Sequence, residues 1–234
     1  MTPAEATWRV HDTLNAFYEP VSLDTPRRAP MRELISTMLS HRTTHRDEEL
    51  AYDRMLAAFG DWAGVEAAPL DALAHEIRTT RWPGVQAPRI QEALRRIRAQ
   101  TGGAYTLDFL AEMPTDDAMR WLTDLPGVGF KTASLLLLFN FRKPVMPVDT
   151  HVHRVAQRVG IIGPKVTHDQ AHTILLSYLG PDPAVLFSYH IHNLWHGQRI
   201  CFFSNPNCPG CPLNTFCEYG RRRPEHGSPA RTAS

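Results

Sequence analysis

Apolar residues recur at helical spacing along nearly the whole of this chain, and this periodicity limits the folds that it can adopt. In residues 31–39, positions i, i+3, i+4, i+7 and i+8 are apolar, which is the pattern of a helix with one buried face. Residues 51–59 and 90–97 show similar stripes. Thr167-x-x-Gln170 is a capping box that predicts the start of another helix. No segment alternates apolar and polar residues over the length of a strand, so the sequence predicts an all-α protein.

Charge is balanced over the whole chain but not along it. The 25 Lys and Arg residues and 24 Asp and Glu residues give a formal net charge of +1, which by itself points to no polyanionic partner. Residues 125–168, however, contain six basic residues and one acid, Asp149. Such a segment is either a solvated face or a surface for a polyanion.

All four cysteines lie close together near the end of the chain. They are Cys201, Cys208, Cys211 and Cys217, with the spacing C-x6-C-x2-C-x5-C. The chain has no secretory signal, so we expect a reducing compartment and no disulfides. Four thiolates are the usual ligands of a [4Fe–4S] cluster and also of structural zinc. The spacing leaves both open and favours iron–sulfur slightly.

A glycine-containing turn is predicted at residues 125–129, which read L-P-G-V-G. It links a short helix that ends at Asp124 to an apolar helix that begins near Phe130. Glycine permits a tight turn, and the first amides of the second helix point outward as an anion site. A DNA phosphate is a natural ligand for such a site, and an ordinary helix–helix turn is the alternative.

Lys131 and Asp149 are the candidate catalytic residues. Lys131 lies in the first turn of the second helix, where the helix N-terminus and nearby cations disfavour a charged ammonium group. A neutral amine is a nucleophile. Asp149 is predicted to be the N-cap of a later helix. It is either only a cap or, given its isolation among cations, also a group that transfers protons.

Together these motifs resemble the helix-hairpin-helix DNA glycosylases, and within them the endonuclease III branch. The matching segments are L-I-S-T-M-L-S at 34–40, L-P-G-V-G-F-K-T-A at 125–133, P-V-D-T-H-V-H-R-V at 147–155, His196-Gly197, and the cysteine loop at 201–217. They occur in the order expected for the family, and the resemblance favours a [4Fe–4S] cluster over zinc.

The resemblance implies a two-domain all-α fold with a DNA-binding cleft between the domains. A six-helix barrel that contains the helix-hairpin-helix is expected at residues 31–143. A discontinuous iron–sulfur domain is expected from residues 1–30 and 144–220, and residues 221–234 are expected to be a disordered tail.

The resemblance also implies base excision repair by a bifunctional DNA glycosylase and abasic-site lyase. An oxidised pyrimidine would be flipped out of double-stranded DNA, because its glycosidic bond cannot be reached inside the stack. Lys131 would attack C1′ of the sugar and form a Schiff base, and β-elimination would then cut the strand. Asp149 would help to deprotonate the lysine or stabilise positive charge on the sugar. The cluster would hold the loop at 201–217 in shape.

Six residues are expected to contact DNA, four in the turn and two in loops that face the gap left by the flipped base. They are Leu125, Gly127, Val128, Gly129, Arg42 and Trp82. Arg42 stands where the family often has a glutamine, and Trp82 stands where an aliphatic side chain is usual. The loop between Cys201 and Cys208 lacks the Lys or Arg that relatives use there to contact phosphate. These departures leave an alternative open, a damage-binding paralogue with weak or altered catalytic activity.

The remaining expectations concern the state and location of the protein. The longest apolar run, at residues 133–139, is far shorter than the roughly 20 residues that a bilayer span needs. We therefore expect a cytoplasmic, nucleoid-associated protein that acts as a monomer on DNA with damaged bases or abasic sites.

Overall fold

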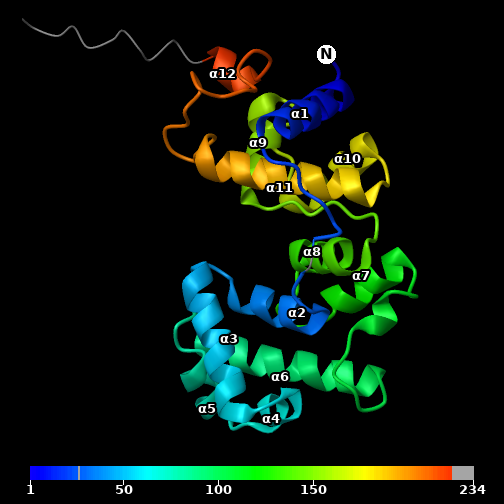
Figure 1. Cartoon of the computed structure of the whole chain (residues 1–234), viewed down its shortest axis with the longest axis vertical. Coiled ribbons are helices and arrows are strands. Elements are labelled where there is room, and N and C mark those ends of the chain that lie inside the picture. Colours follow the sequence, from blue (N-terminus) through cyan, green and yellow to red (C-terminus); the bar gives the residue numbers. More distant parts are fainter. Residues whose placement is uncertain (26, 223–234) are drawn as a thin grey trace, which may run out of the picture. The chain divides into compact units, whose positions relative to one another are not determined.

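The computed structural model describes residues 1–25 and 27–222, and within these residues all regular structure is helical (Figure 1). The predicted all-α class is therefore confirmed. The helices are α1 (Pro3–Phe17), α2 (Pro30–Leu39), α3 (His45–Phe59), α4 (Trp62–Ala67), α5 (Leu70–Glu76), α6 (Pro83–Gln100), α7 (Thr115–Thr123), α8 (Phe130–Phe141), α9 (Thr150–Val159), α10 (His168–Leu179), α11 (Pro183–Arg199) and α12 (Glu218–Arg222), with a short 3-10 turn, η1, at Asp108–Leu110.

The chain divides into two compact units. Unit 1 consists of the described residues of Met1–Thr25 and Pro144–Ser234, and unit 2 consists of those of Pro26–Lys143. That these units are the iron–sulfur and barrel domains stays a prediction. Within the described part of the chain, no helix is long and apolar enough to cross a membrane.

Unit 2 is built around α2 and α6. Helix α2 packs against α3, α6 and α8, and α6 also packs against α4 and α5. The apolar stripe of α2 is buried, with Leu34, Ile35 and Leu39 fully removed from solvent. Each such side chain contributes about 1.5–3 kcal/mol to the free energy of unfolding. This core fixes the turn between α7 and α8, because α7 packs on α8 and α8 on α2.

Unit 1 is built around α11. This helix packs against α1, α9 and α10, and its Phe187 and Tyr189 are among the largest fully buried side chains. Helix α9 also packs against α12. Helix α9 is therefore held on several sides, which fixes the direction of the residues at its two ends.

Most predicted helix boundaries agree with the structure. The Thr167 side chain and Gln170 form the expected capping box at the start of α10, and Gly60 ends α3 with a positive φ of 81°. The predicted tail differs, because Arg221 and Arg222 belong to α12. The rest of that predicted disordered tail, residues 223–234, lies outside the described residues.

Candidate active site and metal centre

The turn between α7 and α8 leaves the start of α8 open. Gly127 has a φ of 85°, a conformation that favours glycine, and the Val128 amide donates to the Leu125 carbonyl at 3.1 Å. Leu125 and Val128 are buried and anchor the turn. Gly129 is the N-cap of α8, and among the described residues no side chain caps this end. The first amides of α8 are therefore in the arrangement that an anion site requires.

Two arginines of helix α6 contact this turn. A Cβ atom built on Gly127 would lie 2.9 Å from Cδ of Arg89, so the backbone of the turn approaches the Arg89 side chain closely. Arg96 Nη1 donates to the Asp124 carbonyl at 2.9 Å. Glycine at position 127 is thus needed for its positive φ, whereas the flexible Arg89 side chain could shift to make room for a Cβ.

Lys131 is exposed in the first turn of α8, and two titratable groups of unit 2 lie close enough to be affected by its charge. Burial raises the pKa of Glu33, an effect that the positive charges of Arg28 and Lys131 oppose. Burial lowers the pKa of His41, and the charges of Lys131 and Arg89 lower it further. Sequence reasoning missed Glu33. The available signal was a single acid on the apolar helix α2.

Asp149 is the N-cap of α9, as predicted. Its Oδ1 atom accepts hydrogen bonds from the amides of His151 at 2.9 Å and Val152 at 2.8 Å. The side chain is half-buried, and Oδ2 has no hydrogen-bond partner among the residues that the structure describes. One oxygen thus fixes the direction of the carboxylate, and the other is available to a ligand or a proton.

The structure brings Arg42 and Trp82 together within unit 2. The Arg42 guanidinium lies over the Trp82 ring, 5.9 Å from its centroid, and Trp82 is 42% exposed. Gln86 ties the two loops by donating to the carbonyls of Met38 and Leu39 at 3.0 and 3.2 Å. Arg42 and Trp82 line one pocket, together with His41, Val85, Gln86 and Arg89. Sequence reasoning missed this pairing because the two residues are far apart along the chain.

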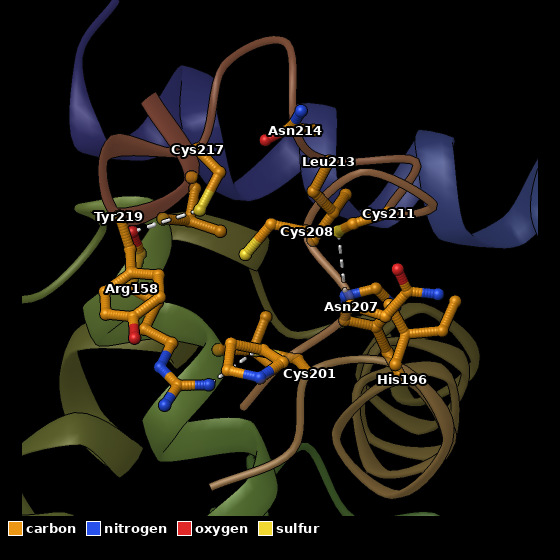
Figure 2. Close-up of a pocket in the computed structure, with 15 residues that line it drawn as sticks. Arg158, His196, Cys201, Asn207, Cys208, Cys211, Leu213, Asn214, Cys217 and Tyr219 are labelled. Atoms are coloured by element: carbon orange, nitrogen blue, oxygen red, sulfur yellow. Dashed lines mark hydrogen bonds between the residues drawn. The ribbon is translucent and has the colours of Figure 1, made fainter. Parts of the chain in front are cut away.

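All four cysteines line a single pocket in unit 1 (Figure 2). Arg158 Nη1 donates to the sulfur of Cys201 at 3.3 Å. Nε2 of His196 lies 3.4 Å from the sulfur of Cys211, and the Cys217 thiol donates to the Arg158 carbonyl at 3.2 Å. The cysteine loop is thus held against α9 and α11.

The cysteine sulfurs of this pocket form a donor set that suits a metal. Four cysteine sulfurs match the ligands of a [4Fe–4S] cluster. Four cysteine sulfurs are also the ligands of structural zinc, so the donor set in this pocket suits either metal, and Cys201, Cys208, Cys211 and Cys217 would hold it.

One further group has the side chains of a metal site. His45, Glu48 and Glu49 place their ligand atoms within 4.8 Å of one another. Both glutamates, however, already pair with arginines, Glu48 with Arg28 and Glu49 with Arg28 and Arg32. These ion pairs account for the cluster of charges without a metal.

The expected site residues divide between the two units. Unit 2 contains Lys131, Arg42, Trp82 and the turn at 125–129, and unit 1 contains Asp149 and the cysteines. In unit 2 the structure brings Arg42 to Trp82, and in unit 1 it brings the cysteines to one pocket beside α9.

Comparisons with known proteins show which family the chain resembles. Residues 35–181 match the HhH-GPD superfamily of base excision DNA repair proteins. Endonuclease III of Thermotoga maritima is 33% identical over 198 residues, which cover 83% of this chain and 85% of that protein. The DNA glycosylase/AP lyase ROS1 of Arabidopsis thaliana is 29% identical over 174 residues, covering 68% of this chain and 12% of that protein.

The fold has a solved counterpart as well. The structure of a trapped endonuclease III–DNA covalent intermediate superposes with a TM-score of 0.78 at 24% identity, covering 94% of this chain and 98% of that one. The chain therefore belongs to the HhH-GPD superfamily of base excision DNA repair proteins and, within it, to the endonuclease III family of DNA glycosylases.

Proposed function

We propose that this enzyme is a bifunctional glycosylase and abasic-site lyase that removes oxidised pyrimidines from double-stranded DNA, acting as a monomer. The observation that carries the proposal is the position of Lys131, in the first turn of a helix whose N-terminus has no side-chain cap among the described residues. The amides at this end bind a backbone phosphate, with Leu125, Gly127, Val128 and Gly129 forming the turn. A bound phosphate would place the adjoining nucleotides close to an amine.

The chemistry follows from the amine and a carboxylate. The target nucleotide is flipped out of the duplex, and the Lys131 amine attacks C1′ while the bond from C1′ to the base breaks. The base leaves with the bonding electrons and takes up a proton. Asp149 accepts the proton released by the lysine or stabilises positive charge on the sugar, using the oxygen that does not cap α9.

The strand is then cut from the lysine adduct. The sugar ring opens to give a Schiff base between C1′ and the Lys131 nitrogen, which acidifies the C2′ hydrogen. Loss of that proton expels the 3′ phosphate, because the C3′–O bond breaks as the C2′–C3′ double bond forms. No redox step and no external reactant other than water is needed.

The proposal includes a [4Fe–4S] cluster held by Cys201, Cys208, Cys211 and Cys217. When bound, this cluster supplies a structural cross-link within the loop at 201–217. Arg158 and His196 orient two of the ligand sulfurs, as hydrogen-bond partners of the ligand atoms do in other metal sites. A brown protein with visible iron–sulfide absorption supports this part of the proposal, and a colourless protein that contains zinc contradicts it.

Borohydride trapping with an abasic duplex tests the lysine directly. The chain has three lysines, Lys131, Lys143 and Lys165, so an adduct is simple to map. The wild type and a Lys165→Ala control, which changes an exposed loop residue, should form a covalent adduct, and Lys131→Ala should not. An equally strong adduct with Lys131→Ala would disprove the assignment.

The contact between Arg42 and Trp82 favours a second candidate, a damage-binding paralogue with weak turnover. These side chains are bulkier than the glutamine and aliphatic residues that the family often has, and their pairing ties the two loops to each other. A panel of defined lesions and opposite bases separates the candidates. Tight lesion binding without base release or nicking would support the second one.

A further inference from the structure

Three polar side chains of unit 1 link the end of α1 to the cysteine pocket. The Tyr18 hydroxyl lies 3.3 Å from Nδ1 of His196, and Nε2 of the same ring lies 3.4 Å from the sulfur of Cys211. The dashed line between His196 and Cys211 in Figure 2 marks the second contact. His196 is 1% exposed, so its two ring nitrogens meet these protein groups instead of water.

The backbone of the cysteine loop also fixes the position of His196. The His196 carbonyl accepts hydrogen bonds from the amides of Ile200 at 3.0 Å and Cys201 at 2.8 Å. Both of these contacts close the end of α11, which packs against α1 and α9. The ring therefore cannot move away from Cys211 without disturbing the backbone of a second cysteine.

Residues of α11 hold the ring of Tyr18. This ring stacks on His192 with the centroids 5.9 Å apart, meets Trp195 edge-on at 6.0 Å, and lies under the Arg199 guanidinium, 5.7 Å from its centroid. Nε2 of His192 also lies 3.0 Å from the Glu19 carbonyl, next to Tyr18 in the chain. These contacts account for the packing of the ring, but they do not involve its hydroxyl.

The chemistry of a metal ligand determines the direction of both hydrogen bonds. A thiolate that holds a metal has no hydrogen and can only accept, so His196 must donate to Cys211 from Nε2–H. A neutral imidazole carries one such hydrogen, so Nδ1 is then an acceptor that requires a donor. The Tyr18 hydroxyl is that donor. Burial raises the pKa of Tyr18 to about 12, so the hydroxyl keeps its hydrogen at neutral pH.

We propose that Tyr18 is a positioning residue for the metal centre, whose hydroxyl holds the His196 ring with Nε2–H directed at the Cys211 thiolate. The proposal rests on the metal centre of the proposed function. Tyr18 does not itself line the cysteine pocket, so it acts on the metal only through His196.

Two properties of the metal centre should depend on this arrangement. Hydrogen bonds to the ligand sulfurs help to set the reduction potential of an iron–sulfur cluster. They stabilise the more negative, reduced state, so they raise the potential. A hydrogen-bond partner of a ligand atom also keeps that ligand in place and strengthens metal binding.

Tyr18→Phe tests the hydroxyl alone, because it keeps the aromatic ring and its contacts with α11. The protein is the full chain with its native metal content and without DNA. The reduction potential should fall, as measured by protein-film electrochemistry, and a chelator should bleach the iron–sulfide absorption about 10-fold faster. Tyr178→Phe is the matched control, because it removes a hydroxyl from a half-buried tyrosine of α10 in the same unit. It should behave as the wild type in both measurements.

His196→Gln distinguishes hydrogen bonding from packing. The amide nitrogen of glutamine always carries hydrogens, so it can donate to the Cys211 sulfur without help from Tyr18. When Tyr18→Phe is added to His196→Gln, the rate of metal loss should therefore change by less than about twofold. If His196→Gln does not fold, the comparison of Tyr18→Phe with Tyr178→Phe still decides.

Two results would overturn the proposal. One is a Tyr18→Phe variant with the potential and the rate of metal loss of the wild type. The other is an effect of Tyr18→Phe that is equally large with His196 and with glutamine at that position, because the hydroxyl would then act by packing. Failure of the proposed metal centre looks different, since the wild type would then be colourless. In a colourless protein that contains zinc, release of zinc to a chelating dye compares the same variants, because a zinc-bound thiolate accepts the same hydrogen bond.

Discussion

The N-termini of α8 and α9 use the same backbone geometry in opposite ways. Helix α8 begins at Gly129, where no side chain of the described residues caps it, and it has Lys131 in its first turn. Helix α9 begins at Asp149, whose carboxylate accepts hydrogen bonds from two amides. A helix N-terminus carries roughly half a positive charge. The N-terminus of α8 can bind an anion of a ligand, whereas the N-terminus of α9 already binds the Asp149 carboxylate.

Because of this difference, the N-terminus of α8 suits substrate binding and that of α9 suits the chemical step. The open amides at α8 suit a phosphate that must arrive and leave with the substrate. At α9 the two amide donors hold Oδ1 of Asp149 and leave Oδ2 in a fixed direction. Replacing the residue at the N-terminus of α8 should impair phosphate binding, and replacing the one at α9 should impair proton transfer. Neither change should unfold the helix.

The largest effect is expected from Asp149→Asn. Asparagine caps a helix as well as aspartate does, so the free energy of unfolding should fall by less than about 1 kcal/mol. Loss of the carboxylate as a proton acceptor should lower the rate of base release about 10³-fold. Single-turnover release of the base and thermal unfolding, measured on the same preparation, check both parts.

Asp149→Ala is the matched variant for that experiment. It removes the charge and the cap, so it should lower the rate to a similar extent and also reduce stability by about 1 kcal/mol. If Asp149→Asn released bases within twofold of the wild-type rate, Asp149 would be only a cap.

The features that the sequence predicted correctly at these two ends are local ones. Asp149 was identified as an N-cap because the preference for aspartate there depends on the next three amides alone. The turn at 125–129 was predicted because glycine is the residue that suits a positive φ such as that of Gly127. The four cysteines of one short segment line one pocket, and the metal centre that they indicate stays a prediction.

The features that sequence reasoning missed depend on contacts between distant segments. Glu33 and His41 are affected by the charge of Lys131, which lies 98 and 90 residues further along the chain. Arg42 meets Trp82 across a gap of 40 residues. No periodicity or motif encodes such pairs, because they follow from how α2, α6 and α8 pack.

A smaller effect is expected from Gly129→Asp, which gives α8 the kind of cap that α9 has. The position tolerates a side chain, since its φ is −93° and a Cβ would meet nothing within 4 Å. An aspartate cap should stabilise the protein by about a few tenths of a kcal/mol relative to glycine, and it should exclude phosphate by its charge and by occupying the amides. Affinity for an abasic duplex should fall about 100-fold, measured by fluorescence anisotropy.

Gly129→Asn is the control for the charge at that position. It competes for the same amides without repelling phosphate, so its affinity should lie between those of the wild type and Gly129→Asp. Wild-type affinity for Gly129→Asp would mean that the N-terminus of α8 binds no phosphate, and the contrast between the two helices would then lose its functional meaning.

The smallest effect is expected from a fall in pH, which should destabilise the segment before α9. His172 on α10 is buried, its Nδ1 pairs with the Met146 carbonyl, and Nδ1 of His190 lies 3.0 Å from the Pro147 carbonyl. Burial lowers the pKa of His172 to about 4 from a usual value of 6.5. Below pH 6.5 the unfolded chain therefore binds a proton that the folded chain does not, and stability falls until about pH 4.

This loss should amount to about 2 kcal/mol at pH 5, at about 1.4 kcal/mol per pH unit below 6.5. His172→Asn keeps a donor near the Met146 carbonyl but does not titrate, so its free energy of unfolding should change less between pH 7 and pH 5, as measured by urea denaturation. His75→Asn, a change at an exposed histidine of unit 2, should follow the wild-type curve.

Because His172 supports the segment that leads into α9, amide exchange at pH 5 should rise around residues 146–152 before it rises at the start of α8. Equal rises at both ends would mean that acid does not distinguish the two helices, and that His172 does not hold the N-terminus of α9 in place.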